Sequence, residues 1–104
     1  MRGRVEVEMD AYDDGVHWLV WCDHCICWHG HGRGPGDRGA HCHFEDSPYR
    51  ANGYVLRYAG RFTKEIEQAH AAEVKEAQRV YRRWVSKGGR GTWGHVWAEH
   101  LAAE

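Results

Sequence analysis

The sequence predicts a single α+β domain, in which a small antiparallel sheet carries a zinc site and one long helix packs on the sheet. Three observations lead to this prediction. Residues 1–60 contain alternating apolar residues and an Asp-Asp-Gly turn, a pattern typical of short strands. Apolar residues then recur every three or four positions over 63–88, as in an amphipathic helix. Within residues 1–60, the segment 22–43 is rich in cysteine and histidine, the side chains that bind zinc.

The chain has 104 residues, the usual size of one domain. We therefore expect one zinc-stabilised domain over 1–104, with strands and metal site in 1–60, the long helix in 63–88 and a short terminal helix in 92–104. The net charge of −1 excludes a uniformly basic nucleic-acid binder. The basic character lies in 61–104, which carry eight bases against six acids.

Two strands joined by a tight turn are predicted at the start of the chain. Residues 4–9 alternate apolar and charged side chains, which indicates a strand with one polar face. The segment AYDDG at 11–15 has turn chemistry, and 16–22 form a second strand rich in Val and Trp. Together these segments predict a hairpin that leads the chain to Cys22.

The middle of the chain is predicted to form two loops, the first of them rich in glycine. Residues 30–40 contain five glycines and one proline, so they should form neither a helix nor a central strand, and we expect a flexible loop. A second loop is expected at 46–53, before a third strand at 54–60.

The long helix has both ends marked in the sequence. Thr63 is a plausible N-cap, and Glu65 and Glu67 follow it in the first turn, where the helix dipole favours acids. Gly88 and Gly89 end the helix. The apolar face expected to pack on the sheet comprises Ile66, His70, Val74, Ala77, Tyr81, Trp84 and Val85.

The strongest signal is a cluster of soft metal ligands. Cys22-x-x-Cys25 has the spacing of a zinc knuckle, and a second group around Cys42 follows the glycine-rich loop. The N-terminus has no export signal, and in a reducing compartment such cysteines favour a metal over disulfides. Structural zinc takes four ligands in a tetrahedron. The set predicted to bind Zn²⁺ is Cys22, Cys25, His31 and Cys42, with His29 and His41 as alternates.

Neighbouring residues are expected to differ in their relation to this site. Adjacent side chains in an extended chain point to opposite sides, so His41 and Cys42 should not bind the same ion. Cys27 is expected to be a buried thiol beside the site rather than a ligand. His24, inside the knuckle, is expected to face solvent.

The same segment resembles a family of small zinc-binding proteins from actinobacteria and their phages and mobile elements. The resemblance rests on C-x2-C-x3-H-x-H-G, then DRGAHC, DSPY and GY, and covers residues 22–58. The chain departs from the family pattern at Gly39, where a branched apolar residue is usual, and at the additional Cys27. The resemblance implies zinc and a phage or actinobacterial setting, and it carries no activity over to this chain.

These observations favour a non-enzymatic, zinc-stabilised binding module, zinc-finger-like and of phage or mobile-element origin, that acts on a host protein. A cysteine-rich site is usually closed and structural, which disfavours catalysis. One alternative is a zinc-dependent hydrolase or nuclease, in which the surplus histidines leave an open coordination position. The other is a nucleic-acid-binding zinc protein.

The candidate partner surface is a basic strip on the long helix, which comprises Lys75, Arg79, Arg82 and Arg83. Its simpler interpretation is a solvated helix face. No apolar run approaches the roughly 20 residues that a bilayer requires, so we expect no membrane span and a cytoplasmic location, in the host cytosol if a phage encodes the chain. The oligomeric state stays open.

Overall fold

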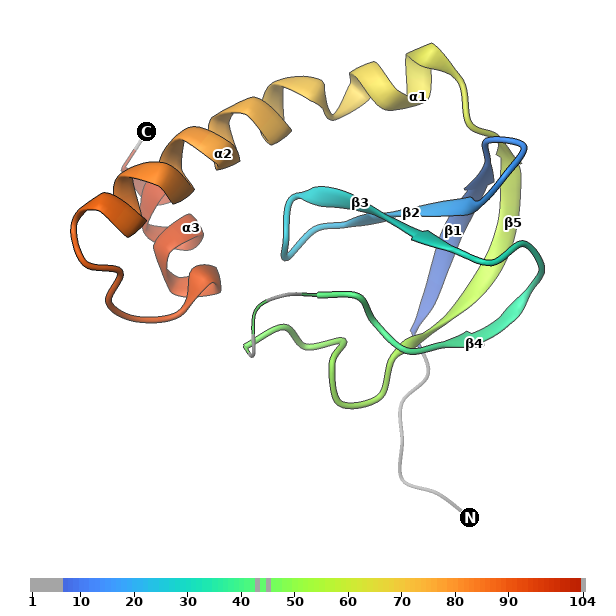
Figure 1. Cartoon of the computed structure of the whole chain (residues 1–104), viewed down its shortest axis with the longest axis horizontal. Coiled ribbons are helices and arrows are strands. Elements are labelled where there is room, and N and C mark those ends of the chain that lie inside the picture. The colour runs from blue at the N-terminus through green and yellow to red at the C-terminus, as the bar shows by residue number, and fades with distance from the viewer. Residues whose placement is uncertain (1–6, 43, 45, 104) are drawn as a thin grey trace.

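The computed structural model describes residues 7–42, 44 and 46–103 and confirms the α+β class. The strands form one curled sheet, and the helices leave its edge and arch over to the far side of the molecule (Figure 1). The strands are β1 (Glu8–Asp13), β2 (Trp18–Cys22), β3 (Cys27–His31), β4 (Gly36–Arg38) and β5 (Tyr54–Arg61). The helices are α1 (Lys64–Ala69), α2 (Ala71–Ser86) and α3 (Trp93–Ala102).

The first hairpin is present, with its turn placed later than predicted. Strands β1 and β2 pair antiparallel, with Ala11 opposite Val20. Asp14 fixes the turn, because its Oδ1 accepts hydrogen bonds from the Val16 and His17 amides at 2.8 and 2.6 Å. Strand β1 therefore continues through residues expected to turn, while residues 4–6 of the predicted strand at 4–9 lie outside the described residues.

The sheet has the order β3-β2-β1-β5-β4 and contains one parallel pair, β1 with β5. The other pairs are antiparallel, as expected. Parallel strands need a long crossover, and residues 14–53, which contain β2, β3 and β4, connect β1 to β5. Strands β3 and β4 were not predicted from the sequence. Strand β4 lies at the sheet edge, where a glycine-rich segment can form a strand.

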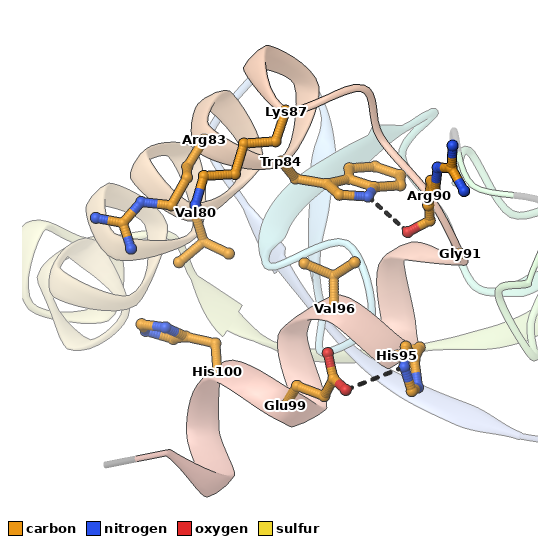
Figure 2. A pocket seen from close by; sticks show the side chains of 10 residues that line it. All are labelled: Val80, Arg83, Trp84, Lys87, Arg90, Gly91, His95, Val96, Glu99 and His100. Carbon is orange, nitrogen blue, oxygen red and sulfur yellow. Dashed lines mark hydrogen bonds and ion pairs between the residues drawn. The ribbon is translucent and has the colours of Figure 1, made fainter.

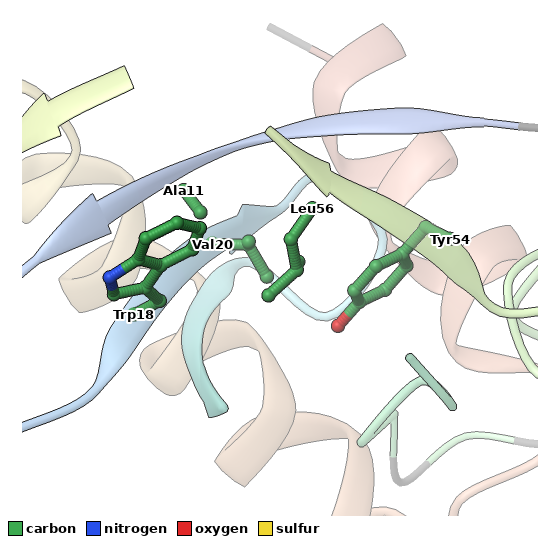
Figure 3. Close-up of a cluster of buried hydrophobic side chains, with 5 residues drawn as sticks. All are labelled: Ala11, Trp18, Val20, Tyr54 and Leu56. Carbon is green, nitrogen blue, oxygen red and sulfur yellow. The ribbon is translucent and has the colours of Figure 1, made fainter. Parts of the chain in front are cut away.

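The inside of the curled sheet holds the first hydrophobic cluster (Figure 3). Its members come from β1, β2 and β5, on the strand faces that point inward, and each is almost fully buried. The cluster comprises Ala11, Trp18, Val20, Tyr54 and Leu56.

The predicted long helix is divided at His70 into α1 and α2. Thr63 caps α1, as predicted, and its Oγ1 accepts a hydrogen bond from the Ile66 amide at 3.3 Å. The His70 ring stacks on Trp21 of β2 with ring centroids 3.9 Å apart, which ties the junction of the two helices to the sheet. The helical pattern ends before Gly88, whose φ is +97°, as predicted.

Helix α2 packs on the tip of the β2–β3 hairpin and on α3, rather than lying across the sheet. The second hydrophobic cluster contains Ile26 from the hairpin, Ala77 and Val80 from α2 and Trp93 from α3. Tyr81, predicted to pack inward, is exposed, because the tip of the hairpin offers a narrower surface than a sheet. In the described part of the chain, no helix has both the length and the apolar character that crossing a bilayer demands.

Candidate metal centre

The β2–β3 hairpin positions three metal-type side chains in a knuckle. Cys22 ends β2, Cys25 lies in the turn and His29 lies in β3. The Cys25 amide donates to Cys22 Sγ at 3.3 Å, and the Ile26 amide donates to the Cys22 carbonyl at 2.9 Å. An N–H group directed at a sulfur, like that of Cys25, stabilises a thiolate, whereas the Ile26 hydrogen bond closes the turn.

Cys42 completes a group of four with these residues. The ligand atoms of Cys22, Cys25, His29 and Cys42 all lie within 4.8 Å of one another, and all four residues are buried. Cys42 Sγ lies 3.6 Å from Cys22 Sγ and 3.7 Å from His29 Nε2. A tetrahedron with zinc bond lengths has edges of about 3.8 Å between sulfurs and about 3.6 Å between sulfur and nitrogen. The donor set and its spacing therefore fit zinc.

The same distances exclude a disulfide between Cys22 and Cys42, which would bring the sulfurs to about 2.05 Å. None of the four cysteines, all within the described residues, forms a disulfide bond. Three sulfurs and one imidazole nitrogen thus share one buried space.

The fourth member of the group differs from the first choice of the sequence analysis. His29, held there as an alternate, lies with the three cysteines, whereas His31 Nε2 lies 2.6 Å from the Tyr54 hydroxyl. Both histidines are on the same face of β3, but two residues of strand separate them by about 6.6 Å. His29 is the one opposite Val20, nearer the knuckle, while His31 is opposite Trp18.

The other alternate, His41, lies near His31 and outside the group of four. Its ring centroid is 4.3 Å from that of His31 and 6.4 Å from that of His29. Cys27 also lies outside the group. Cys27 is half-buried, and this burial raises the pKa of its thiol.

Burial controls protonation around the site. It raises the pKa of the Cys22 thiol to about 11, so without a cation this sulfur keeps its proton at neutral pH. It lowers the pKa of His31 to about 4, with help from nearby His41 and Arg38. It also raises the pKa of Tyr54 well above its usual range. A neutral imidazole and a protonated phenol can therefore share the hydrogen bond that holds His31 away from the cysteines.

The knuckle is also the docking point of α3. Trp93 Nε1 donates to the His24 carbonyl at 2.8 Å, and the Gly94 amide donates to Asp46 Oδ2 at the same distance. Asp46 Oδ1 in turn lies 3.3 Å from His24 Nε2. The expectation that His24 faces solvent is wrong: its side chain is only 11% exposed, because α3 and Asp46 cover it.

The basic strip lies on exposed positions of α2, as expected. Lys75, Arg82 and Arg83 are exposed, and Arg79 is paired with Glu76 through two hydrogen bonds of 3.0 and 2.6 Å. No pattern in the sequence indicated that α3 folds back beside α2, so the groove between the two helices was not predicted.

Comparisons of the chain with protein-family models, with curated proteins and with solved structures found no match. What the protein does must therefore be inferred from its own residues.

Proposed function

We propose that this chain is a non-enzymatic binding module stabilised by one zinc ion, held by Cys22, Cys25, His29 and Cys42. The observation that carries the proposal is the buried group of four ligand atoms, all within 4.8 Å of one another. Three thiolates and one imidazole suit zinc, a borderline-soft ion that takes four such ligands.

The proposed role of the ion is structural. Its ligands would join the β2–β3 hairpin to Cys42, which lies in the connection between β4 and β5. The tip of the hairpin carries Ile26 of the second hydrophobic cluster. Four protein ligands fill a tetrahedral shell, whereas a zinc hydrolase keeps one position for water. The ligand set therefore favours a module over the alternative of a zinc-dependent hydrolase or nuclease.

Elemental analysis of protein purified without added metal tests the zinc proposal. We expect one zinc per chain. Stoichiometric metal should be lost in His29→Gln and retained in His31→Gln, a matched change two residues along the same strand. Absence of stoichiometric metal, or a Cys22–Cys25 disulfide under reducing conditions, would overturn the proposal. Equal loss in both histidine variants would overturn the ligand assignment.

The proposed partner is a host protein, in keeping with a phage or mobile-element origin and with a cytosol that keeps thiols reduced. The exposed cations of the basic strip on α2 support a charged contact. Replacing Arg79, Arg82 and Arg83 with Glu should leave the fold intact and abolish capture of host proteins. If the variant captures the same proteins as the wild type, the strip is a solvated face. A nucleic-acid partner would instead show a steep fall in affinity with salt.

A further inference from the structure

A groove separates α2 from α3, and none of the four residues of the candidate metal centre lines it (Figure 2). Its volume is about 610 Å³. The C-terminal half of α2, the connecting segment and α3 supply its walls. The lining residues are Val80, Arg83, Trp84, Lys87, Arg90, Gly91, His95, Val96, Glu99 and His100.

The floor of the groove is apolar. Val80 and Val96 face one another from the two helices, with the Trp84 ring beside them (Figure 2). Trp84 Nε1 donates to the Arg90 carbonyl at 2.8 Å, which fixes the connecting segment at the end of the groove. The floor can therefore accept an apolar side chain without leaving the indole N–H unpaired.

The rim carries an excess of positive charge. Arg83, Lys87 and Arg90 contribute three permanent cations, against one acid, Glu99, which lies 3.3 Å from His95. Among the described residues, no carboxylate forms an ion pair with any of these three cations. This excess is local, because the whole chain has a net charge of −1.

The nearest further acid on α2 is already engaged. Glu76 binds Arg79 at 2.6 Å and lies 2.7 Å from His100 Nε2, with the same carboxylate oxygen involved in both contacts. Hydrogen bonding from Arg79 lowers the pKa of Glu76 to about 2, so this carboxylate stays charged toward its present partners. The three rim cations are thus left to attract an anion from outside the chain.

We propose that this groove binds an acidic peptide segment of a partner protein, with an apolar side chain on the Val80–Val96 floor and carboxylates against the three rim cations. This inference rests on the proposed function as a binding module and names its surface and its partner chemistry. A single-stranded nucleic acid fits less well, because such ligands stack their bases on exposed aromatic faces, and two of the three floor residues are valines.

Selection from a random peptide display library on the immobilised, zinc-loaded protein tests the groove. We expect selected peptides to combine Asp or Glu with a large apolar residue. Their binding should shift the NMR signals of the Trp84 indole N–H and of the Val80 and Val96 methyl groups. The variant with Arg83, Lys87 and Arg90 all changed to Gln should bind at least about tenfold more weakly, because three charge contacts at a rim each contribute a few-fold.

A matched control changes the same number of charges outside the groove. The variant with Arg50, Arg61 and Lys64 changed to Gln, all exposed and outside both the groove and the basic strip, should bind within about twofold of the wild type, apart from weak long-range effects. Thermal unfolding of both variants checks that the fold is kept.

Several outcomes would overturn the inference. Selected peptides without acidic residues, equal weakening in both variants, or NMR shifts confined to the opposite face of α2 would each do so. So would tighter binding of a poly-thymidine strand than of any selected peptide. None of these results would affect the zinc measurement, so failure of the groove is distinguishable from failure of the zinc-stabilised module.

Discussion

At the scale of single residues, Gly53 shows how closely the loop before β5 approaches the rest of the sheet. Its φ is +68°, and a Cβ atom there would lie 2.1 Å from the Arg38 carbonyl oxygen. Both the backbone conformation and the contact exclude a side chain. Gly39 offers a contrast, because a Cβ atom there would meet nothing within 4 Å.

We therefore predict that Gly53→Ala lowers the free energy of unfolding by about 2–4 kcal/mol. Alanine is strained in a left-handed conformation, and its Cβ atom would push the Arg38 carbonyl away. Gly39→Ala, the control, should change it by less than about 0.5 kcal/mol. Urea unfolding of the two zinc-loaded variants measures both values. Similar stability of the two variants would contradict the close approach at Gly53.

Protonation of Cys22 sets the pH dependence of zinc binding. The metal-free thiol keeps its proton up to about pH 11, and zinc binds the thiolate, so binding must release at least this proton. Zinc affinity should therefore rise with pH, by at least about tenfold per unit between about pH 6 and about pH 8, and fall as the solution is acidified. Competition with a chelator of known affinity at several pH values measures the slope. A flat profile would show that Cys22 is not a ligand.

The candidate metal ligands show which features of the site could be predicted from the sequence. The spacing of Cys22, Cys25 and Cys42 was enough to predict a shared ion. It could not choose between His29 and His31, because both lie on one face of β3. The choice between the two histidines depends on where Cys42 lies relative to β3, and the tertiary fold determines that position.

At the scale of elements, α3 is held against the knuckle by a close backbone contact. A Cβ atom on Gly94 would lie 2.7 Å from Asp46 Oδ2 and 3.0 Å from His24 Cε1. Alanine favours helices over glycine by about 1 kcal/mol, so local propensity and tertiary docking act in opposite directions at this position.

We predict that the close contact at Gly94 outweighs helix propensity. Gly94→Ala should therefore destabilise the protein by about 1–2 kcal/mol, although alanine has the better helix propensity. Ala98→Gly, at an exposed position of α3, should cost only the ordinary propensity difference of about 1 kcal/mol. The NMR signal of the Trp93 indole N–H, which donates to the His24 carbonyl, reports detachment of α3 directly. An unchanged signal together with increased stability in Gly94→Ala would contradict the prediction.

The helices also show why sequence pattern alone was incomplete. The apolar period continues across His70, so a single helix was predicted, and the interruption arises where His70 stacks on Trp21, 49 positions earlier in the chain. Strand β3 was missed for a related reason: its Cys and His residues indicated ligands, and these residue types carry no strong strand preference. The first hairpin, the α1 N-cap and the glycine-marked end of α2 were local features, and sequence predicted them.

At the scale of the whole molecule, the metal centre lies between two small hydrophobic clusters. One is inside the curled sheet, and the other joins the hairpin tip to α2 and α3. The cysteines form a third buried group, which contacts partly buried residues such as Phe44 that also pack against the second cluster. Neither hydrophobic cluster is large, so their connection depends on what holds the cysteines together.

Removing zinc should therefore lower the midpoint of thermal unfolding by more than about 15 °C, or abolish the cooperative transition. In a domain of this size a loss of about 3 kcal/mol alone shifts the midpoint by about 12–24 °C, and metal binding energy in small domains is folding energy. Calorimetry before and after chelation measures the shift. Cys25→Ser should reproduce it, whereas Cys27→Ser, a matched change outside the group, should keep both zinc and transition. An unchanged transition after complete zinc removal would show that the ion is not structural.

The hydrogen bond from Trp93 to the His24 carbonyl has a consequence beyond stability. Helix α3 forms one wall of the groove, and the knuckle that would bind the proposed zinc holds the N-terminus of that helix. Two ligands that favour the same conformation must strengthen each other by equal factors. A peptide bound in the groove would therefore raise the affinity of the knuckle for zinc, and removal of zinc would weaken peptide binding by the same factor.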